Sequence, residues 1–345
     1  MKQKENMKRY GNLYSKISDL KNIEHAHHRA RKGKRHYNAV KNIDSNSKKY
    51  FQGLHEIFAN NEYRTSEYQV MTKNTSGKTR VIYKLPYYPD RIAHHCIMNI
   101  LEPIWESVLI RDTYSSIKGR GIHDGVARVK GFLSDVPGTQ YCLKIDVKKF
   151  YPSIDHKILK DIIRKKIKCA KTLSLLDEII ESTPGVPIGN YLSQYFGNLY
   201  LAYFDHWCKE ILKIQYYARY CDDVVIFGPD KPGLHVVLKT IVEYLRCNLK
   251  LELNKNYQIF PTAVRGVDFL GYRFFGDYTL IRKGIASRFK RQMLKIDHGN
   301  AHMKPLQCRS SVMSYKGWFA HADSHRLWDK YFTPNIEHAV TLHAS

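Results

Sequence analysis

The alternation of apolar and polar positions along the chain predicts short strands between amphipathic helices. Residues 68–85 form two short alternating runs around the turn-forming residues 74–78, which is typical of a β-hairpin. Residues 141–150 alternate cleanly, with Leu143 and Ile145 on one side. This pattern predicts a half-buried strand that ends in an acid, Asp146.

Apolar residues that recur every three or four positions predict helices elsewhere in the chain. The predicted helices cover residues 90–109, 156–168, 191–212 and 234–249. Asp155 precedes the second of them in the position of an N-cap. The beginning and the end of the chain are also expected to be helical. Helices interspersed with antiparallel strand pairs indicate an α+β fold rather than a doubly wound sheet.

Two acids separate the next pair of apolar runs, residues 216–220 and 224–228. Adjacent carboxylates such as Asp222 and Asp223 repel each other, and a hydrophobic hairpin solvates them poorly. An exposed structural turn would explain them. A divalent cation is the other explanation, because hard cations prefer oxygen ligands. Asp146, at the end of another predicted strand, is placed to complete such a site.

Composition and charge point to a nucleic-acid partner. The chain has 345 residues, of which 43% are hydrophobic, and its 56 Lys and Arg against 32 Asp and Glu give a net charge of +24. The hydrophobic content excludes a disordered or fibrous protein, and the positive charge favours binding to a polyanion. The excess is densest in residues 1–50, with 14 Lys and Arg against 4 Asp and Glu.

The segment 21–37 within this region places four histidines among lysines and arginines. It lacks cysteine or carboxylate partners at zinc-ligand spacing, so a zinc site is not expected. The segment is interpreted as a basic helix or arm that lies on phosphates, with a merely solvated helix as the alternative.

The remaining features set the general class. None of the seven cysteines is at C-x-x-C spacing, so reduced cysteines are expected. No stretch of 18 apolar residues occurs, which predicts a soluble, cytoplasmic protein without membrane contact. Nucleotide-binding and hydrolase signatures of the G-x-x-x-x-G-K-[ST] and G-x-S-x-G types are missing. The acids therefore favour two-metal phosphoryl transfer.

Four motifs in order now resemble those of reverse transcriptases. Residues 220–223, YCDD, resemble the YxDD box, and residues 146–154, DVKKFYPSI, resemble the first catalytic motif of that family. Residues 184–201 are similar to the motif that positions template and incoming nucleotide, and FLGY at 269–272 resembles the strand pair that grips the primer end. The order and spacing agree over roughly residues 65–280.

The resemblance implies a right-hand polymerase fold of the α+β class. Its implied divisions are a basic N-terminal helical extension over residues 1–65, fingers with the start of the palm over 66–140, a palm over 141–280 and a helical thumb over 281–345. The palm would combine an antiparallel sheet with helices.

The resemblance also implies an RNA-directed DNA polymerase with Asp146, Asp222 and Asp223 as catalytic residues. These acids, with the carbonyl of Val147, would hold two Mg²⁺ ions, which Mn²⁺ could replace. The implied ligands are an RNA template, a primer or cDNA strand and deoxynucleoside triphosphates.

The same resemblance assigns further residues to the substrates. Those implied to bind the nucleotide are Lys78, Arg80, Arg91, Tyr151, Ile188 and Gly189. Those implied to contact template or primer are Gln194, Tyr220, Phe269, Leu270 and Gly271. Tyr151 would be the steric gate against ribonucleotides. The alternatives are a structural salt bridge for Arg91, core packing for Tyr151 and a plain helix-surface position for Gln194.

One position departs from the family pattern. Many relatives have a lysine where this chain has Tyr257, as a proton donor to pyrophosphate. Lys255, two residues earlier, is the doubtful substitute.

Ile188 suggests a narrower subfamily. Retroviral, intron and retron enzymes generally carry Gln between the Pro and Gly of this motif, whereas Ile188 followed by Ser193-Gln194 resembles reverse transcriptases of diversity-generating retroelements, found in bacteria and phages. That resemblance implies errors at template adenines, mutagenic retrohoming and a small helical accessory protein. A defence-associated or group II intron-like reverse transcriptase remains the alternative. A non-catalytic RNA-binding protein with a polymerase shell is another, against which the three intact acids argue.

Overall fold

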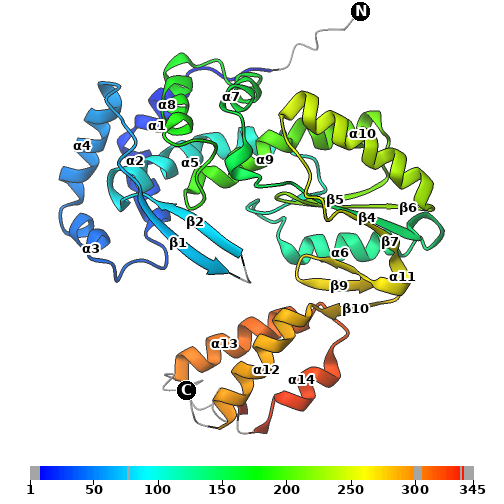
Figure 1. Cartoon of the computed structure of the whole chain (residues 1–345). Coiled ribbons are helices and arrows are strands. Elements are labelled where there is room, and N and C mark those ends of the chain that lie inside the picture. Colours follow the sequence, from blue (N-terminus) through cyan, green and yellow to red (C-terminus); the bar gives the residue numbers. More distant parts are fainter. Residues whose placement is uncertain (1–7, 76–77, 299–304, 335, 338–345) are drawn as a thin grey trace, which may run out of the picture. The chain divides into compact units, whose positions relative to one another are not determined.

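The computed structural model describes residues 8–75, 78–298, 305–334 and 336–337, and the chain divides into two compact units (Figure 1). The first unit contains residues 1–116, 147–213 and 241–254. The second contains residues 117–146, 214–240 and 255–345. Each unit interleaves segments that are distant in the sequence.

The first unit is mainly helical. Its helices are α1 (Tyr14–Ser18), α2 (Leu20–Ala30), α3 (Asn38–Ser45), α4 (Ser47–Ala59), α5 (Ile92–Glu106), α7 (His156–Arg164), α8 (Ala170–Glu181) and α9 (Tyr191–His206). Its strands are β1 (Gln69–Thr75), β2 (Lys78–Lys84) and β3 (Thr113–Tyr114). A π-helical turn, Tyr87–Arg91, leads into α5.

The core of this unit forms around α5, whose Ile92, Ile97 and Leu101 are fully buried. Helix α2 packs against it, with Ile23 and Ala26 also fully buried. The basic N-terminal segment is therefore helical, as predicted, but it is an amphipathic layer of the core rather than a separate arm. Most of its charged residues are exposed, but Arg29 is paired with Glu102 of α5.

A local sequence signal explains the start of α7, whereas two other helices lacked a clear signal. The Asp155 carboxylate accepts a hydrogen bond from the backbone N–H of Ile158 at 3.0 Å, which confirms the predicted N-cap of α7. Helices α8 and α6 (Ile122–Leu133) were not predicted. In α6 the glycines at 125 and 131 weaken the helical pattern of the sequence. The glycine-containing loop before Ile122 also suggested that the loop continues into residues that are helical in the structure.

The second unit combines two antiparallel sheets with helices. Its strands are β4 (Tyr141–Asp146), β5 (Tyr216–Tyr220), β6 (Asp223–Gly228), β7 (Gln258–Pro261), β8 (Val267–Phe269), β9 (Tyr272–Phe275) and β10 (Tyr278–Ile281). Its helices are α6, α11 (Thr262–Arg265), α12 (Lys283–Asp297), α13 (Pro305–Phe319) and α14 (His325–Tyr331), and α10 (Lys231–Leu249) begins here.

The larger sheet places four strands of this unit in the order β5-β6-β4-β7, all antiparallel. Helix α6 covers one face and the beginning of α10 covers the other (Figure 1). On the α6 side, the Phe132 ring lies 5.5 Å from that of Tyr216 and 6.3 Å from that of Phe227. The smaller sheet has the order β10-β9-β8.

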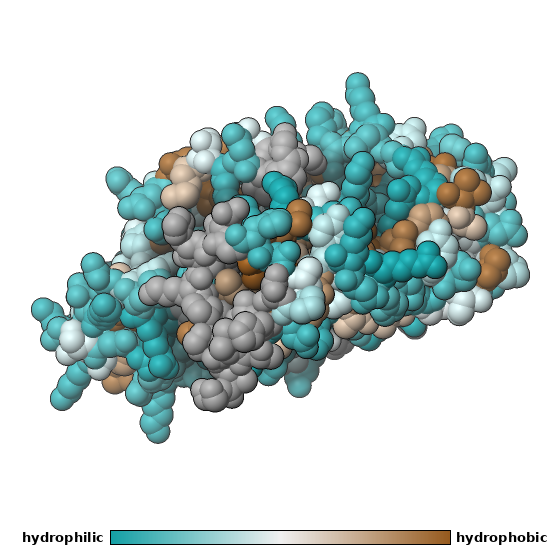
Figure 2. All heavy atoms as spheres, turned by 90° about the horizontal axis from the view of Figure 1, so that it is seen from below, coloured by the Kyte–Doolittle hydropathy of each residue, from teal (hydrophilic) through white to brown (hydrophobic). Residues whose placement is uncertain are grey.

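The surface is consistent with a basic, water-exposed protein. The face shown in Figure 2 carries mostly hydrophilic side chains with small, separate hydrophobic areas. Among the described residues, no helix is both long enough and apolar enough to cross a membrane.

Candidate active site

The two central acids lie where β5 turns into β6. The turn consists of Cys221 and Asp222, and Cys221 adopts a left-handed backbone conformation with φ of 58°. A non-glycine residue in this region needs support from its surroundings. Arg219, whose side chain is fully buried, donates an Nη1–H hydrogen bond to the Cys221 carbonyl at 2.8 Å. Arg219 thus fixes the turn that presents Asp222 and Asp223.

The third acid arrives from the neighbouring strand. Asp146 at the end of β4 is the cross-strand partner of Asp223, and Tyr220 on β5 is the partner of Asp223 on the other side. The strand register therefore brings Asp146, Asp222 and Asp223 to one corner of the sheet, which is called the acid corner below. Tyr220 lies at the same corner and is partly exposed.

Asp223 is only partly neutralised by its surroundings. Its side chain is 29% exposed, and Oδ2 accepts a hydrogen bond from Lys144 Nζ at 3.2 Å. Its Oδ1 is buried and has no hydrogen-bond partner. A buried carboxylate oxygen without a partner is costly, and such an atom commonly marks a place for an ion or ligand.

Burial and mutual repulsion make these carboxylates reluctant to ionise. Burial raises the pKa of Asp223 to about 6, with further contributions from Asp146 and Asp222, and Lys144 opposes the rise. Burial also raises the pKa of Asp222, followed by the charge of Asp146. A cation at this corner would reverse both effects.

The acid corner fits a divalent cation chemically. It offers the hard carboxylate oxygens that Mg²⁺ prefers, including the unpartnered Oδ1 of Asp223. Among the described residues, no three His, Cys, Asp or Glu side chains already stand close enough together to hold a metal ion. The carboxylates would therefore have to turn toward the ion, and Asp223 would have to exchange its contact with Lys144.

The turn between β8 and β9 contains the FLGY motif of the same unit. Phe269 and Leu270 are buried, while Leu270 and Gly271 both have positive φ, at 54° and 86°. A Cβ on Gly271 would lie 2.6 Å from the Trp318 ring, so only glycine fits. Phe269 and Leu270 thus serve the packing of this turn.

A lysine that the sequence did not single out connects this turn region to the acid corner. Lys144 Nζ also donates to the backbone carbonyl of Asp268, and the Asp268 carboxylate pairs with Arg282. Lys144 therefore contacts both Asp223 and strand β8. Its alternation with buried Leu143 and Ile145 places it on the acid side of β4, but the sequence carries no signal for its partners.

The first unit holds the residues expected to bind the nucleotide. The predicted hairpin is present as β1 and β2, and Arg80 is exposed opposite Lys73. Lys78 begins β2, but its side chain and residues 76–77 lie outside the described part of the chain. Arg91 is half-buried at the end of the π-helical turn.

The loop that contains Ile188 and Gly189 is held against this hairpin. The backbone N–H of Tyr83 donates to the Ile188 carbonyl at 2.8 Å. Gly189 has φ of 123°, and a Cβ there would lie 2.5 Å from the Tyr83 carbonyl oxygen. The Ser193 hydroxyl donates to the Pro187 carbonyl at 2.6 Å and closes the loop from the α9 side. The contacts that Tyr83 of β2 and Ser193 of α9 make with this loop were not predicted from the sequence.

Tyr151 and Gln194 occupy defined positions in the same unit. The Tyr151 carbonyl accepts from the N–H of Val186 at 2.9 Å. Its ring lies close to Gly197 on α9, where an added Cβ would approach the ring to 3.2 Å. Gln194 is exposed, and its Oε1 accepts from the Ser116 hydroxyl at 2.6 Å. The Tyr151 ring is partly packed and partly exposed, which is compatible with either role considered for it.

The two remaining sequence candidates differ in exposure. Val147 is buried, and its carbonyl lies 3.5 Å from the Asn254 side-chain amide nitrogen. Lys255 is exposed in the turn before β7, and the Tyr257 side chain is 47% exposed. Both Lys255 and Tyr257 are thus accessible to solvent.

Comparison with known proteins gives a family. The model described as "Reverse transcriptase (RNA-dependent DNA polymerase)" matches residues 71–274. Protein YkfC of Escherichia coli is 25% identical over 260 residues, which cover 62% of this chain and 66% of that protein. The group II intron-encoded protein LtrA of Lactococcus lactis is 24% identical over 187 residues, or 51% of this chain and 30% of that protein. The chain thus spans less than two thirds of either relative.

A solved structure supports the fold. Telomerase from Candida tropicalis in complex with a fragment of telomeric RNA superposes with a TM-score of 0.51 and 13% identity, over 68% of this chain and 49% of that one. At this identity the likeness concerns the fold alone. Together with the family match, it confirms the predicted α+β polymerase fold.

Proposed function

This chain belongs to the reverse transcriptase family, and from that premise we propose that it is an RNA-directed DNA polymerase that copies an RNA template into cDNA. The observation that carries the proposal is the acid corner. Strand register brings Asp146 and Asp223 opposite each other, and the tight turn adds Asp222. These three carboxylates are the set of oxygen ligands that two-metal nucleotidyl transfer uses, once the side chains turn toward the ions.

Asp146, Asp222 and Asp223 would provide the oxygen ligands, with the Val147 carbonyl as a further one. Two Mg²⁺ ions, or Mn²⁺ in their place, would supply the Lewis acidity that activates the primer 3′-hydroxyl and stabilises the leaving pyrophosphate. Lys144 would hold Asp223 in position until a cation replaces it. Lys255 remains the proposed proton donor to the pyrophosphate, and its exposed position makes it available to solvent and ligand.

Lys78, Arg80 and Arg91 would bind the triphosphate, with Ile188 and Gly189 beneath the nascent base pair. Tyr220 and Gln194 would contact template and primer. The β8–β9 turn, residues 269–271, would contact the primer through its backbone, because the Phe269 and Leu270 side chains are buried. The divisions at residues 1–65, 66–140, 141–280 and 281–345 remain the proposed N-terminal extension, fingers, palm and thumb.

The direct test measures incorporation of deoxynucleotides on a primed RNA template with and without Mg²⁺. Incorporation that depends on the metal and on the primer supports the polymerase. RNA binding without any incorporation would support the non-catalytic alternative instead.

Tyr151 is proposed as the gate that excludes ribonucleotides. Its ring backs onto Gly197 of α9, so it cannot retreat toward the helix when a 2′-hydroxyl arrives. Tyr151→Ala should therefore reduce the preference for deoxynucleotides, measured as the ratio of kcat/KM values for dNTP and NTP. An unchanged ratio in an active variant would assign Tyr151 to packing alone.

The finer proposal is a diversity-generating retroelement enzyme that makes errors at template adenines for mutagenic retrohoming, with a small helical accessory protein. It rests on Ile188, which cannot donate the side-chain hydrogen bond of the usual glutamine. Since one hydrogen bond contributes about 0.5–1.5 kcal/mol, its loss could raise errors several-fold without stopping synthesis. Ile188→Gln should lower misincorporation opposite adenine in sequenced cDNA. Unchanged misincorporation during normal extension would remove this role from Ile188.

An intron-type reverse transcriptase is the second candidate, and the LtrA similarity favours it. Template and variable repeats beside the gene would distinguish a retroelement that diversifies a target from an intron. In their absence, with an intron RNA encoding the chain, the second candidate would be preferred.

A further inference from the structure

A cluster of cations surrounds the turn between α2 and α3 in the first unit. Residues 31–36 form this turn, in which the N–H of Lys34 donates to the Arg31 carbonyl at 2.9 Å and the N–H of Tyr37 donates to the Lys34 carbonyl at 2.9 Å. Helix α3 contacts the π-helical turn 87–91. Short backbone bonds and this contact therefore fix the position of Lys34.

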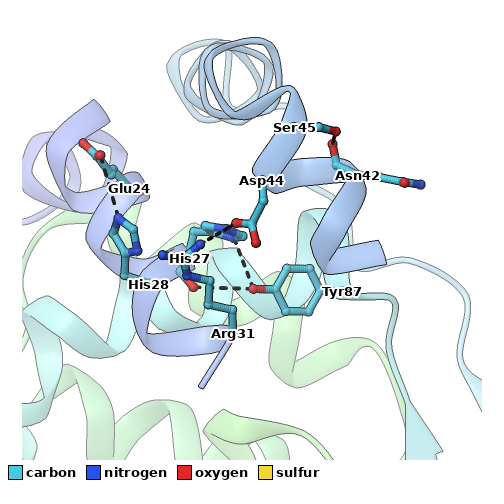
Figure 3. A network of polar contacts seen from close by, with 8 residues as sticks. All are labelled: Glu24, His27, His28, Arg31, Asn42, Asp44, Ser45 and Tyr87. Carbon is cyan, nitrogen blue, oxygen red and sulfur yellow. Dashed lines mark hydrogen bonds and ion pairs between the residues drawn. The ribbon is translucent and has the colours of Figure 1, made fainter. Parts of the chain in front are cut away.

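Two arginines of this cluster are already neutralised. Arg31 Nη1 lies 2.6 Å from the Asp44 carboxylate, which also accepts from His27 Nε2 at 2.7 Å, while the Tyr87 hydroxyl lies 3.1 Å from His27 Nδ1 (Figure 3). Arg29 is paired with Glu102 at 3.1 Å. In the network of Figure 3, the Asp44 carboxylate is therefore already occupied by Arg31 and His27.

Lys34 and Arg91 are different. Both are half-buried, and within the described part of the chain neither side chain has a hydrogen bond or an ion pair. The Nε of Arg91 is buried without a partner. A buried donor without a partner is costly, and the part of the chain that the structure describes supplies no counter-ion to this pair.

The electrostatic effect of the pair is visible in its neighbours. The charge of Arg91, followed by burial, lowers the pKa of Lys34. Burial lowers the pKa of His95 to about 3, and Arg91, Arg29, His94 and Lys34 add to this effect. His95 is therefore neutral, and its ring stacks on Tyr191 with centroids 4.3 Å apart.

We propose that Lys34 and Arg91 bind a phosphate group of a single-stranded nucleic-acid backbone, a role that replaces the triphosphate contact proposed above for Arg91. A guanidinium and an ammonium close enough for their charges to interact provide the charge and the donors that a phosphate group requires. Two further exposed cations, Lys32 and Arg35, lie in the same turn. They could meet neighbouring phosphates of one strand, which favours a strand over a free anion.

An aromatic surface beside the pair supports the same ligand. Tyr37 is 50% exposed, and His36 packs edge-on against it with centroids 4.4 Å apart. Cations interleaved with exposed aromatic rings are the common pattern of single-strand binding, in which bases stack while phosphates meet the charges. The proposal thus deepens the proposed function by naming a strand contact outside the acid corner, and binding can be tested without catalysis.

The experiment measures binding of a single-stranded RNA oligonucleotide to the full chain across a salt series, without Mg²⁺ or nucleotides. Lys34→Ala should weaken binding several-fold and lower the slope of log K against log salt by about 0.7, the value for one phosphate contact on a single strand. Lys48→Ala, an exposed lysine on α4, is the matched control and should change both quantities less.

A second variant separates a binding role from a structural one. Lys34→Glu should place an acid beside Arg91, so it should raise the melting temperature of the free protein while it weakens RNA binding further. A lysine needed only for packing would lower both. Lys34→Glu that binds RNA like wild type would overturn the proposal.

The source of the phosphate is tested in parallel. If Lys34→Ala leaves RNA affinity unchanged but raises KM for deoxynucleotides, the pair binds a triphosphate and the assignment to a strand is wrong. RNA binding that depends on Lys34 in a protein without polymerase activity would contradict the proposed function but support this contact.

Discussion

The acid corner of the second unit and the Lys34–Arg91 pair of the first unit are both clusters of like charge. At the acid corner, Lys144 pairs with one of the three carboxylates, that of Asp223, and the other oxygen of Asp223 has no partner. At the cation pair, no described acid is paired with either residue. Each cluster would be relieved by a ligand of opposite charge.

The two clusters respond differently to repulsion. A carboxylate can take up a proton, and the pKa of Asp223 rises to about 6. Arginine stays charged at all ordinary pH values, so the repulsion acts on the titration of Lys34 and lowers its pKa. Protonation can thus lower the negative charge of the metal-free acid corner as the pH falls. The cation pair, in contrast, keeps at least the charge of Arg91.

The largest expected effect is the loss of catalysis when an acid of the acid corner is replaced. Asp223→Asn should reduce primer extension by at least about a hundredfold, because a charge that stabilises the transition state is lost. RNA binding should remain near wild type. The control is Asp277→Asn, which changes an exposed acid between β9 and β10 of the same unit. Parallel loss of RNA binding in folded Asp223→Asn would instead indicate a structural role for the acid.

The same substitution should stabilise the metal-free protein. With its pKa raised in the folded state, Asp223 favours folding most below the ordinary pKa of 3.8, and this contribution is lost as pH rises through about 6. At pH 8 the cost of the charge is at most about 3 kcal/mol, at about 1.4 kcal/mol per pKa unit. Asp223→Asn should therefore raise the melting temperature in chelator at pH 8 but hardly at pH 4. A lower melting temperature at pH 8 would show that the Lys144 contact outweighs the repulsion.

A histidine next to the cation pair gives the opposite pH dependence. His95 has a lowered pKa in the folded state, so its contribution to stability is present above the ordinary value of 6.5 and is lost as pH falls toward 3. The loss at pH 5 should be about 2 kcal/mol. His95→Phe keeps a ring against Tyr191 and removes no hydrogen bond, since neither ring nitrogen has a partner. It should flatten the fall in melting temperature between pH 7 and 5.

The matched control for this prediction is His25→Gln, a change at an exposed position of α2. It should leave the pH dependence as in wild type. If His95→Phe also leaves it unchanged, the acid sensitivity of this unit originates elsewhere.

The smallest effect sharpens the comparison from the other side. Lys144→Met removes a cationic partner of Asp223, so the metal-free protein should lose about 0.5–1 kcal/mol at pH 8. At pH 5, where Asp223 is mostly protonated, the loss should be smaller. Chemical denaturation at the two pH values measures the difference, and an equal loss at both would mean that Lys144 acts through Asp268 instead.

Sequence patterns predicted the strands around the acids because residues 141–146 alternate and residues 216–220 and 224–228 are two apolar runs. The register of the latter pair follows from the short turn between them. The patterns also predicted the hairpin, the N-cap of α7 and the helical ends of the chain. These features depend on local periodicity and turn chemistry, which a sequence displays directly.

Other features depend on contacts between distant segments, which periodicity does not reveal. The burial of Ile23 and Ala26 against α5 made the N-terminal layer part of a core, although its charge suggested an arm. The hydrogen bond from Tyr83 to Ile188 and the contact of Lys144 with β8 likewise join residues far apart in the chain. Their partners could not be inferred from the spacing of residues.

The bond between Tyr83 and Ile188 has a consequence for engineering. It joins β2 to the loop proposed to control fidelity, and Gly189 leaves no clearance for either backbone to shift alone. Random mutagenesis of the exposed positions of β1 and β2, with Lys78 and Arg80 left unchanged, should therefore recover variants with altered error spectra but intact polymerase activity. The accuracy of copying would then be adjustable from the hairpin surface, without any substitution of the acids.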